Sequence, residues 1–339
     1  MLPCPGAFAR TFPPRLIASL DPIRALVADD MAAVDALIRR RLDSDVVLVR
    51  QVAEYIIGSG GKRLRPVLVL LAAGACGYRG PHHHELAAVV EFIHTATLLH
   101  DDVVDESELR RGRRTANAAF GNAASVLVGD FLYSRAFQMM VGVRSMRVME
   151  VLAEATNTIA EGEVMQLLNV HNADVGEDEY LEVVRRKTAK LFEASARLGA
   201  ILGTAPPEAE AGFAAYGRHL GTAFQLVDDV LDYSGDLHET GKNLGDDLNE
   251  GKPTLPLIHV LRRGTPAQKA TVRRAIEEGG REAFAAVLDA IRASGALEVA
   301  RGQARAETLA ACGALAQAGD SAHKQGLLHL AAFAVERNY

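Results

Sequence analysis

Hydrophobic residues recur along most of the chain at the three- and four-residue spacing of an amphipathic helix. In the segment 216–232, Leu220, Phe224, Val227 and Leu231 form one such stripe. The segment 86–100 is strongly apolar and contains no helix breaker, and the pattern continues through 123–149, 148–170 and 266–336. Alternating runs of β-branched and aromatic residues are nearly absent, so we predict an all-α fold.

Three polar, glycine-containing loops interrupt the helical pattern, at 58–66, 106–117 and 234–253. The chain has no Pro/Ser-rich linker, so residues 21–339 are expected to form a single domain. Residues 1–20 contain four prolines, Arg10 and Arg15, and no acidic side chain. We interpret them as a short disordered extension, with a transit peptide as the alternative.

Composition narrows the classes of partner. The 339 residues carry a net charge of −6, and Lys and Arg are spread along the chain, which argues against a nucleic-acid surface. The longest apolar run, near 67–73, is far shorter than the roughly 20 residues that span a membrane. Cys4, Cys76 and Cys312 are too few and too scattered for a disulfide framework or structural zinc site, so we expect a cytoplasmic protein.

An aspartate cluster with the spacing D-D-x-x-D ends the apolar segment 86–100 and comprises Asp101, Asp102 and Asp105. On a helix, residues i and i+4 lie on one face, so Asp101 and Asp105 project together. Asp102 lies about 100° around the helix from Asp101. The pair is therefore a like-charge contact at a helix C-terminal end, where the helix dipole also disfavours anions.

A second cluster, Asp228, Asp229 and Asp232, repeats this arrangement roughly 125 residues later. A solvated acidic turn would account for one cluster alone, but not for two on matching apolar helices. Mg²⁺ prefers carboxylate oxygens together with substrate phosphates. We therefore expect the clusters to face each other across a cavity and to hold about two or three Mg²⁺ ions around a diphosphate.

Basic and polar residues near the clusters are candidates for binding this anion. Lys62 and Arg65 lie in a glycine-led loop and can converge on one anion, which arginine can grip with two hydrogen bonds. Arg110 and Arg111 are adjacent and point in different directions, so they can contact two anions. Further candidates, each unremarkable alone, are Lys187, Thr188, Gln225, Lys242 and Lys252.

The order of these motifs resembles that of the trans-isoprenyl diphosphate synthases, in particular the bacterial long-chain all-trans-polyprenyl diphosphate synthases. The motifs are GGKRLRP, HTATLLHDDVVD, RRGRRTAN, KTAKLFEAS, FQLVDDVLDY and GKNLGDDLNEGKPTLPL. The resemblance runs from about residue 16 to the C-terminus. It implies an isoprenoid-synthase-type helical bundle around a central cavity, usually a homodimer. It also implies condensation of an allylic diphosphate, such as farnesyl diphosphate, with successive isopentenyl diphosphates.

The resemblance also implies a role for each candidate residue. Asp101, Asp105, Asp228 and Lys187 would be catalytic, and all six clustered aspartates would serve the metal ions, with Asp102 and Asp229 in support. The allylic diphosphate would bind Arg110, Lys187, Thr188, Gln225, Lys242 and Lys252. Isopentenyl diphosphate would bind Lys62, Arg65, His94 and Arg111. The product would supply a quinone side chain, which calls for at most transient membrane association.

Product length should depend on the residues one turn before Asp101. Ala96 and Thr97 lie there on the same helical face and are small, so the growing tail can pass and a long product is expected. Ala96→Tyr should shorten it. Phe137, Met139 and Met140 are candidates for the deeper floor, with ordinary helix packing as an equal alternative. The resemblance favours a C40 product, and C45 and C50 stay open.

Three rival interpretations fit less of the sequence. A terpene cyclase or squalene-synthase-like enzyme needs no second anion site, so it leaves Lys62 and Arg65 unexplained. A metal phosphohydrolase using the His100–Asp101 doublet leaves the second aspartate cluster unexplained. A non-catalytic synthase subunit should lack one cluster. Apart from these, the run His82–His84 follows Gly80 and Pro81, so we interpret it as a surface loop rather than a metal-binding tract.

Overall fold

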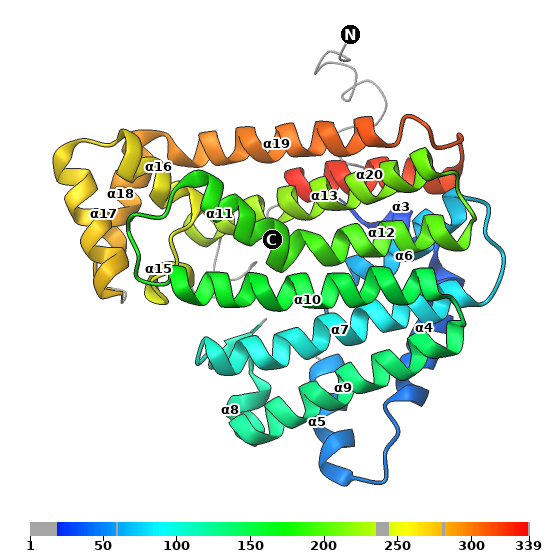
Figure 1. Cartoon of the computed structure of the whole chain (residues 1–339). Coiled ribbons are helices and arrows are strands. Elements are labelled where there is room, and N and C mark those ends of the chain that lie inside the picture. The colour runs from blue at the N-terminus through cyan, green and yellow to red at the C-terminus, as the bar shows by residue number, and fades with distance from the viewer. Residues whose placement is uncertain (1–18, 59, 111, 235–243, 280–281, 338–339) are drawn as a thin grey trace.

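The protein is an all-helical bundle, as the hydrophobic pattern predicts. The computed structural model describes residues 19–58, 60–110, 112–234, 244–279 and 282–337 (Figure 1). Its helices and strands, in chain order, are α3 (Asp21–Leu26), α4 (Ala28–Arg41), α5 (Val47–Gly58), α6 (Leu64–Ala75), α7 (His82–Val104), β1 (Leu109–Arg110), β2 (Arg113–Arg114), α8 (Ala116–Phe120), α9 (Asn122–Val143), α10 (Met146–Asn169), α11 (Glu177–Val184), the π-helical turn η2 (Arg185–Ala189), α12 (Lys190–Leu202), α13 (Pro207–Ser234), α15 (Asp246–Asn249), α16 (Leu255–Arg263), α17 (Pro266–Glu278), α18 (Phe284–Ser294), α19 (Ala296–Ala314) and α20 (Ala322–Glu336).

Long helices lying side by side make up the body of the bundle. Figure 1 shows α7, α9 and α10 below α12 and α13, with α19 along the upper edge. Helix α7 packs against α6 and α9, and α12 packs against α6, α10 and α13. One large apolar cluster joins these helices and includes Phe92, Leu132, Phe192 and Tyr216, each with essentially no exposed surface. Burial of this apolar surface is the main favourable contribution to folding.

The last third of the chain adds a second, smaller core. Helices α16, α17 and α18 pack together at one end of the molecule, at the left in Figure 1. Leu257, Val260, Ile276 and Ile291 are fully or almost fully buried there. A capping box begins α17. The Thr265 side-chain oxygen accepts from the Gln268 backbone N–H, and the Gln268 side-chain oxygen accepts from the Thr265 backbone N–H.

The structure differs from the sequence expectations in two local details. The apolar segment 123–149 is divided between α9 and α10, because Arg144 adopts a left-handed conformation and Ser145 caps the start of α10. The loop 106–117 contains a two-stranded antiparallel hairpin that pairs Leu109 with Arg114. Glycine at position 112, with φ of 72°, allows the tight connection between the strands.

The histidine run also differs from its expectation as a surface loop. Pro81 is the N-cap residue of α7, and His82, His83 and His84 form its first turn. All three side chains are partly buried. Proline and glycine before the run end the preceding loop, so the histidines start the helix.

Two expectations concern parts of the chain that this description does not test. The expected disordered extension, residues 1–20, lies almost wholly outside the described residues, and the single-domain assignment of 21–339 stays a prediction. Among the helices of the described ranges, none is long and apolar enough to cross a membrane.

Candidate active site

The first aspartate cluster ends α7, and its three side chains point in two directions. Asp101 and Asp105 line a cavity and are 16% and 20% exposed. Asp102 is fully buried, and its Oδ1 accepts from Arg110 Nε at 2.8 Å and from Nη2 at 2.6 Å. The helical geometry explains this division, since residue i+1 lies about 100° around the helix from residue i. Asp102 therefore holds Arg110, while Asp101 and Asp105 face the cavity.

Two lysines approach these cavity-facing carboxylates. Lys252 Nζ lies 2.9 Å from Asp105 Oδ2, and Lys187 Nζ lies 3.9 Å from Asp101 Oδ2. Burial raises the pKa of Asp101, and nearby Asp105 raises it further, although Lys187 opposes the shift. Burial lowers the pKa of Lys252, but the charges of Asp105 and Glu250 outweigh it, so the net shift is upward. The shift at Lys252 shows that the carboxylates beside it stabilise positive charge.

Sequence reasoning missed the partners that hold Lys187. Its ammonium donates to Gln166 Oε1 at 2.7 Å and also to Glu163, both on α10. Burial raises the pKa of Glu163 to about 7, with Lys187 lowering it and Asp101 raising it. Glu163 and Gln166 lie on an amphipathic helix that carries many other polar residues, so the sequence alone does not distinguish them.

Lys187 and Thr188 lie in the π-helical turn η2, between α11 and α12. A π-turn holds one more residue than an α-turn, and such turns are frequent at functional sites. Glycine at position 162 lets α10 approach η2 closely, because a Cβ there would lie 2.7 Å from the Lys187 amide nitrogen. The close approach fixes where the Lys187 side chain leaves the backbone.

The second aspartate cluster ends α13. Asp229 is 2% exposed, and its carboxylate accepts from Tyr180 Oη and from Gln225 Nε2, the latter at 2.8 Å. Burial raises the pKa of Asp229 to about 8, Asp247 adds to the shift, and the hydrogen bonds from Tyr180 and Gln225 oppose it. The middle aspartate of each cluster is thus buried against a side-chain donor, Arg110 for Asp102 and Tyr180 for Asp229.

Arg337, near the C-terminus, is a further residue that sequence reasoning missed. Its Nη2 lies 2.7 Å from Asp228 Oδ1 and also donates to the Phe224 carbonyl at 2.7 Å. The guanidinium stacks on the Phe224 ring at 3.7 Å and is almost fully buried. The sequence does not predict the contact between Arg337 and Asp228, because the two residues are far apart in the chain and only the packing of α20 against α13 brings them together.

A small polar pocket brings together four of the residues expected to bind the allylic diphosphate. Lys187, Thr188, Gln225 and Lys252 line it, and its volume is about 70 Å³. Thr188 Oγ1 donates to Gln225 Oε1 at 3.0 Å. Arg110 is paired with Asp102 instead and does not line this pocket, and Lys242 lies outside the described residues.

The residues expected to bind isopentenyl diphosphate converge in part. Arg65 Nη1 lies 3.1 Å from His94 Nε2, and the Arg65 guanidinium stacks 4.5 Å from the centre of the Phe192 ring. Lys62 is partly buried in the loop before α6, and Arg111 lies outside the described residues. Arg63 lies between Lys62 and Arg65 and forms an ion pair with the buried Glu91. Its backbone is in the left-handed conformation at the start of α6.

A much larger cavity of about 1050 Å³ begins at the first aspartate cluster. Asp101, Asp105 and Lys252 line one part, and both polar and apolar side chains of α7, α9 and α10 line the rest. Thr97 and Phe137 are among the lining residues. Ala96, Met139 and Met140 are instead buried in the main core and do not line this cavity, so packing is what the structure shows for them.

The donor set at the mouth of the cavity fits a magnesium ion. Asp101 and Asp105 offer carboxylate oxygens on one face of α7. Glu163 and Glu250, which line the same cavity, add further negative charge. Mg²⁺ binds such hard oxygen donors and completes its shell with water and phosphate. The lysine ammonium groups lie beside the same oxygens and show that cations are favoured there.

Comparison with known proteins adds a consistent set of matches. A family model described as polyprenyl synthetase matches residues 46–292. Octaprenyl diphosphate synthase of Escherichia coli (strain K12) is 55% identical over 321 residues, which cover 94% of this chain and 99% of that protein. The all-trans-nonaprenyl-diphosphate synthase (geranyl-diphosphate specific) of Rhodobacter capsulatus is 45% identical over 93% of this chain and 97% of its own.

Solved structures give the same picture. A polyprenyl synthase from Caulobacter crescentus, crystallised with calcium and isoprenyl diphosphate, superposes with a TM-score of 0.92 at 44% identity. The match covers 95% of this chain and 99% of that one. A decaprenyl diphosphate synthase from Rhodobacter capsulatus superposes with a TM-score of 0.89 at 48% identity, covering 94% and 99%.

Proposed function

The chain belongs to the polyprenyl synthetase family and is a trans-prenyltransferase, and from this premise we propose that it makes an all-trans C40 diphosphate. It would extend an allylic diphosphate such as farnesyl diphosphate with successive isopentenyl diphosphates, in a Mg²⁺-dependent reaction. The observation that carries the proposal is the junction of two cavities. A small pocket that contains Lys187 adjoins a 1050 Å³ cavity at Gln166 and Lys252, which line both. The larger cavity also contains Asp101, Asp105 and a set of apolar side chains from α9 and α10.

Binding of the allylic diphosphate would rest on the small pocket. Lys187 and Lys252 supply positive charge at fixed positions, and Thr188 and Gln225 supply hydrogen-bonding groups between them. When the bond to diphosphate ionises, charge develops on the leaving group, and preorganised cations stabilise that charge most. Mg²⁺ bound by the aspartates would add Lewis-acid stabilisation of the same oxygens.

The second substrate needs its own anion site next to the first. Arg65 and His94 lie together, with Lys62 in the adjoining loop, and this set is our proposed site for isopentenyl diphosphate. Holding both substrates in one orientation converts a bimolecular step into an intramolecular one, which can lower the barrier by roughly 7–11 kcal/mol. The apolar walls of the large cavity would keep water from the allylic cation.

The proposed C40 length of the product, and the main alternative to it, both rest on sequence identity to known synthases. The 55% identity to octaprenyl diphosphate synthases favours C40. The 45% identity to a nonaprenyl-diphosphate synthase makes C45 the principal alternative, with C50 next because of the decaprenyl diphosphate synthase structure. We place the enzyme in the cytoplasm, where its product would supply a quinone side chain.

We also propose that the active protein is a homodimer in which residues 21–339 form one unit. Support comes from apolar side chains that α9 and α10 leave exposed, among them Leu127 at 66%, Val141 at 63% and Leu168 at 74%. If these side chains form one continuous apolar patch, it would be a surface on which a second copy could pack. Light scattering should give twice the mass of the chain, and a monomeric mass at assay concentration would contradict the proposal.

One assay tests the proposed function. Purified protein is incubated with farnesyl diphosphate, labelled isopentenyl diphosphate and Mg²⁺, and product length is read by chromatography after dephosphorylation. We expect C40 as the main product and no incorporation after chelation. Asp101→Asn should lower incorporation by about 100-fold or more, because it removes a charged ligand at the reacting diphosphate. Asp130→Asn, at a more exposed position on the same cavity, should retain activity.

The alternatives give different outcomes in the same assay. A terpene cyclase would consume the allylic diphosphate without incorporating label. A non-catalytic subunit would incorporate none. A main product of C15 or C20 would contradict the long-chain assignment and leave the prenyltransferase assignment intact.

A further inference from the structure

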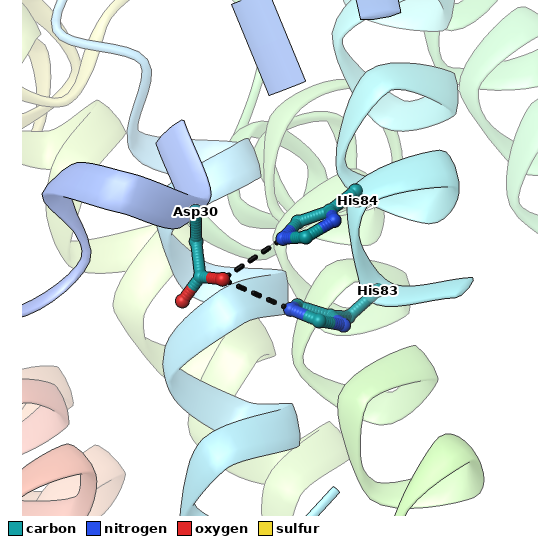
Figure 2. Close-up of side chains that lie close together, drawn as sticks. All are labelled: Asp30, His83 and His84. Carbon is teal, nitrogen blue, oxygen red and sulfur yellow. Dashed lines mark hydrogen bonds and ion pairs between the residues drawn. The ribbon is translucent and has the colours of Figure 1, made fainter. Parts of the chain in front are cut away.

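A cluster of one carboxylate and two imidazoles joins α4 to the start of α7. Asp30 lies in the first turn of α4, and His83 and His84 lie in the first turn of α7 (Figure 2). His84 Nε2 is 2.8 Å from Asp30 Oδ1, and His83 Nε2 is 3.2 Å from the same oxygen. One ligand atom from each residue lies within 4.8 Å of the other two. The cluster is separate from the active site, since about 18 residues of α7, or roughly 27 Å, separate His83 from Asp101.

In its neutral form, His83 cannot donate to both of its contacts. His83 Nδ1 lies 2.6 Å from the Gly80 carbonyl oxygen, and its Nε2 faces the Asp30 carboxylate. Both partners are acceptors, and a neutral imidazole has only one N–H. Whichever nitrogen carries the proton, the other presents a lone pair to an oxygen. Positive charge, from either a second proton on the imidazole or a metal ion between His83 and Asp30, removes this conflict, and titration with Zn²⁺ distinguishes the two.

A metal ion supplies that charge in a common arrangement. A histidine that binds a metal through one nitrogen typically donates its other N–H to a backbone carbonyl, which fixes the tautomer. His83 has this geometry toward Gly80. Burial supports the same conclusion, because the side chains of His83 and His84 are 14% and 27% exposed, and a partly buried cluster loses less to competition from water.

Two of the three distances between the ligand atoms are close to those around zinc. Tetrahedral Zn²⁺ with bonds of about 2.0–2.1 Å has ligand atoms roughly 3.3 Å apart. The two measured edges, 2.8 and 3.2 Å, need only a small expansion to reach that value. Two imidazoles and a carboxylate are also the donors that first-row transition-metal dications prefer, whereas Mg²⁺ prefers oxygen alone.

Asp30 supplies the negative charge of the cluster. An aspartate carboxyl has an ordinary pKa of about 3.9, so it is ionised and available as a ligand at neutral pH. His82, the next residue on the helix, directs its Nδ1 to Glu85 Oε2 at 3.0 Å and is not part of the cluster.

We propose that Asp30, His83 and His84 bind a divalent transition-metal ion, Zn²⁺ by preference, with water as a fourth ligand, and that this ion ties α4 to α7. The ion would act on stability, since it binds only where the two helices are docked. It would not take part in prenyl transfer. The three residues come from two segments far apart in the chain, so the unfolded protein does not offer this site.

The test uses the full-length protein, freed of metals by chelation and kept in excess Mg²⁺ so that the catalytic aspartates are occupied. Zn²⁺ is titrated by calorimetry, and Co²⁺ is titrated with visible absorption as the readout. We expect one Zn²⁺ per chain, strong Co²⁺ absorption of a four- or five-coordinate site, and a melting temperature raised by about 3–5 °C with Zn²⁺.

Matched variants decide the assignment. Asp30→Asn and His84→Asn should each lose the zinc-dependent rise in melting temperature and weaken Zn²⁺ binding at least tenfold, while circular dichroism and prenyl transfer confirm folding. His82→Asn should behave as the wild type. Equal Zn²⁺ binding by the wild type and both ligand variants would overturn the proposal, as would Co²⁺ spectra of a weakly absorbing octahedral site.

Discussion

Asp102 and Asp229 hold the same position in their two clusters, yet each turns into the protein beside a different donor. Asp102 accepts from the cationic Arg110, whereas Asp229 accepts from the neutral Tyr180 and Gln225. Burial, with the nearby Asp247 charge, raises the pKa of Asp229 to about 8. These two aspartates are the best candidates for positioning residues, and the pairs beside them are the best candidates for metal ligands.

At the residue scale, the helical spacing was enough to predict which aspartates share a face. Asp101 and Asp105 do lie together on the cavity, as i and i+4 residues should. The partners of the clusters were not predictable. Glu163, Tyr180 and Arg337 are ordinary residues of their own helices, and only tertiary packing brings them to the aspartates.

Arg337→Met tests whether the C-terminal arginine positions the second cluster. The change keeps an apolar chain over Phe224 but removes the hydrogen bonds to the Phe224 carbonyl and to Asp228. We expect a stability loss of about 1–3 kcal/mol, from the partner left unsatisfied. We also expect kcat/KM to fall about 10- to 100-fold, because Asp228 loses its fixed orientation.

Urea unfolding and steady-state kinetics give the two measurements for this variant. Arg301→Met is the control, since Arg301 is 40% exposed and pairs with the exposed Glu298 on its own helix. If the Arg337 and Arg301 variants have the same kcat/KM, Arg337 does not position Asp228.

At the element scale, the three- and four-residue periodicity predicted the helices well but not their interruptions. The break between α9 and α10 depends on a left-handed Arg144, a residue type that usually avoids that conformation. The π-turn η2 adds one residue within a continuous helical pattern, and its sequence RRKTA is unremarkable. Such local deviations follow from packing against neighbouring helices, which a linear pattern does not contain.

Gly162→Ala tests the contact between α10 and η2. The added methyl group would lie 2.7 Å from the Lys187 amide nitrogen and 2.8 Å from Arg186 Cβ, so α10 and η2 must separate. We expect a destabilisation of about 1–3 kcal/mol from overpacking. We also expect a lower kcat, because Lys187 moves relative to Glu163 and Asp101.

Gly142→Ala is a matched control, because a Cβ at that helical position meets no atom within 4 Å. It should be neutral or stabilise the protein by up to about 1 kcal/mol through better helix propensity. Thermal melting and kcat measure both variants. Equal stability and kcat for the two would show that the approach of α10 to η2 is not critical.

At the scale of the whole molecule, the proposed function depends on a small pocket that holds two lysines and on a large cavity beside it. The sequence predicted a cavity below the first aspartates but placed its walls imperfectly. Thr97 and Phe137 do line it, whereas Ala96, Met139 and Met140 lie in the core. Side-chain direction at buried helix positions depends on which helices pack on either side, and the hydrophobic pattern does not resolve this.

Thr97→Tyr tests whether the large cavity holds the growing chain. The larger side chain would project into the cavity one helical turn from Asp101, so the main product should shorten while the first condensation continues. Chromatography of the dephosphorylated products measures the change. Met140→Leu, a volume-conserving change in the core, should leave the product length unaltered and serves as the control. Unchanged product length in the Thr97 variant would place the chain elsewhere.

The two lysines beside the first aspartate cluster have a consequence for how substrate enters. Lys187 and Lys252 lie beside carboxylates of the first cluster, and both line the pocket where the diphosphate would lie. When the metal-bound diphosphate binds, the two lysine ammonium groups could exchange their contacts with carboxylate oxygens for contacts with phosphate oxygens. The site would change its bonding without a large change in its total charge, so affinity should depend less on ionic strength than in a pocket of unpaired lysines.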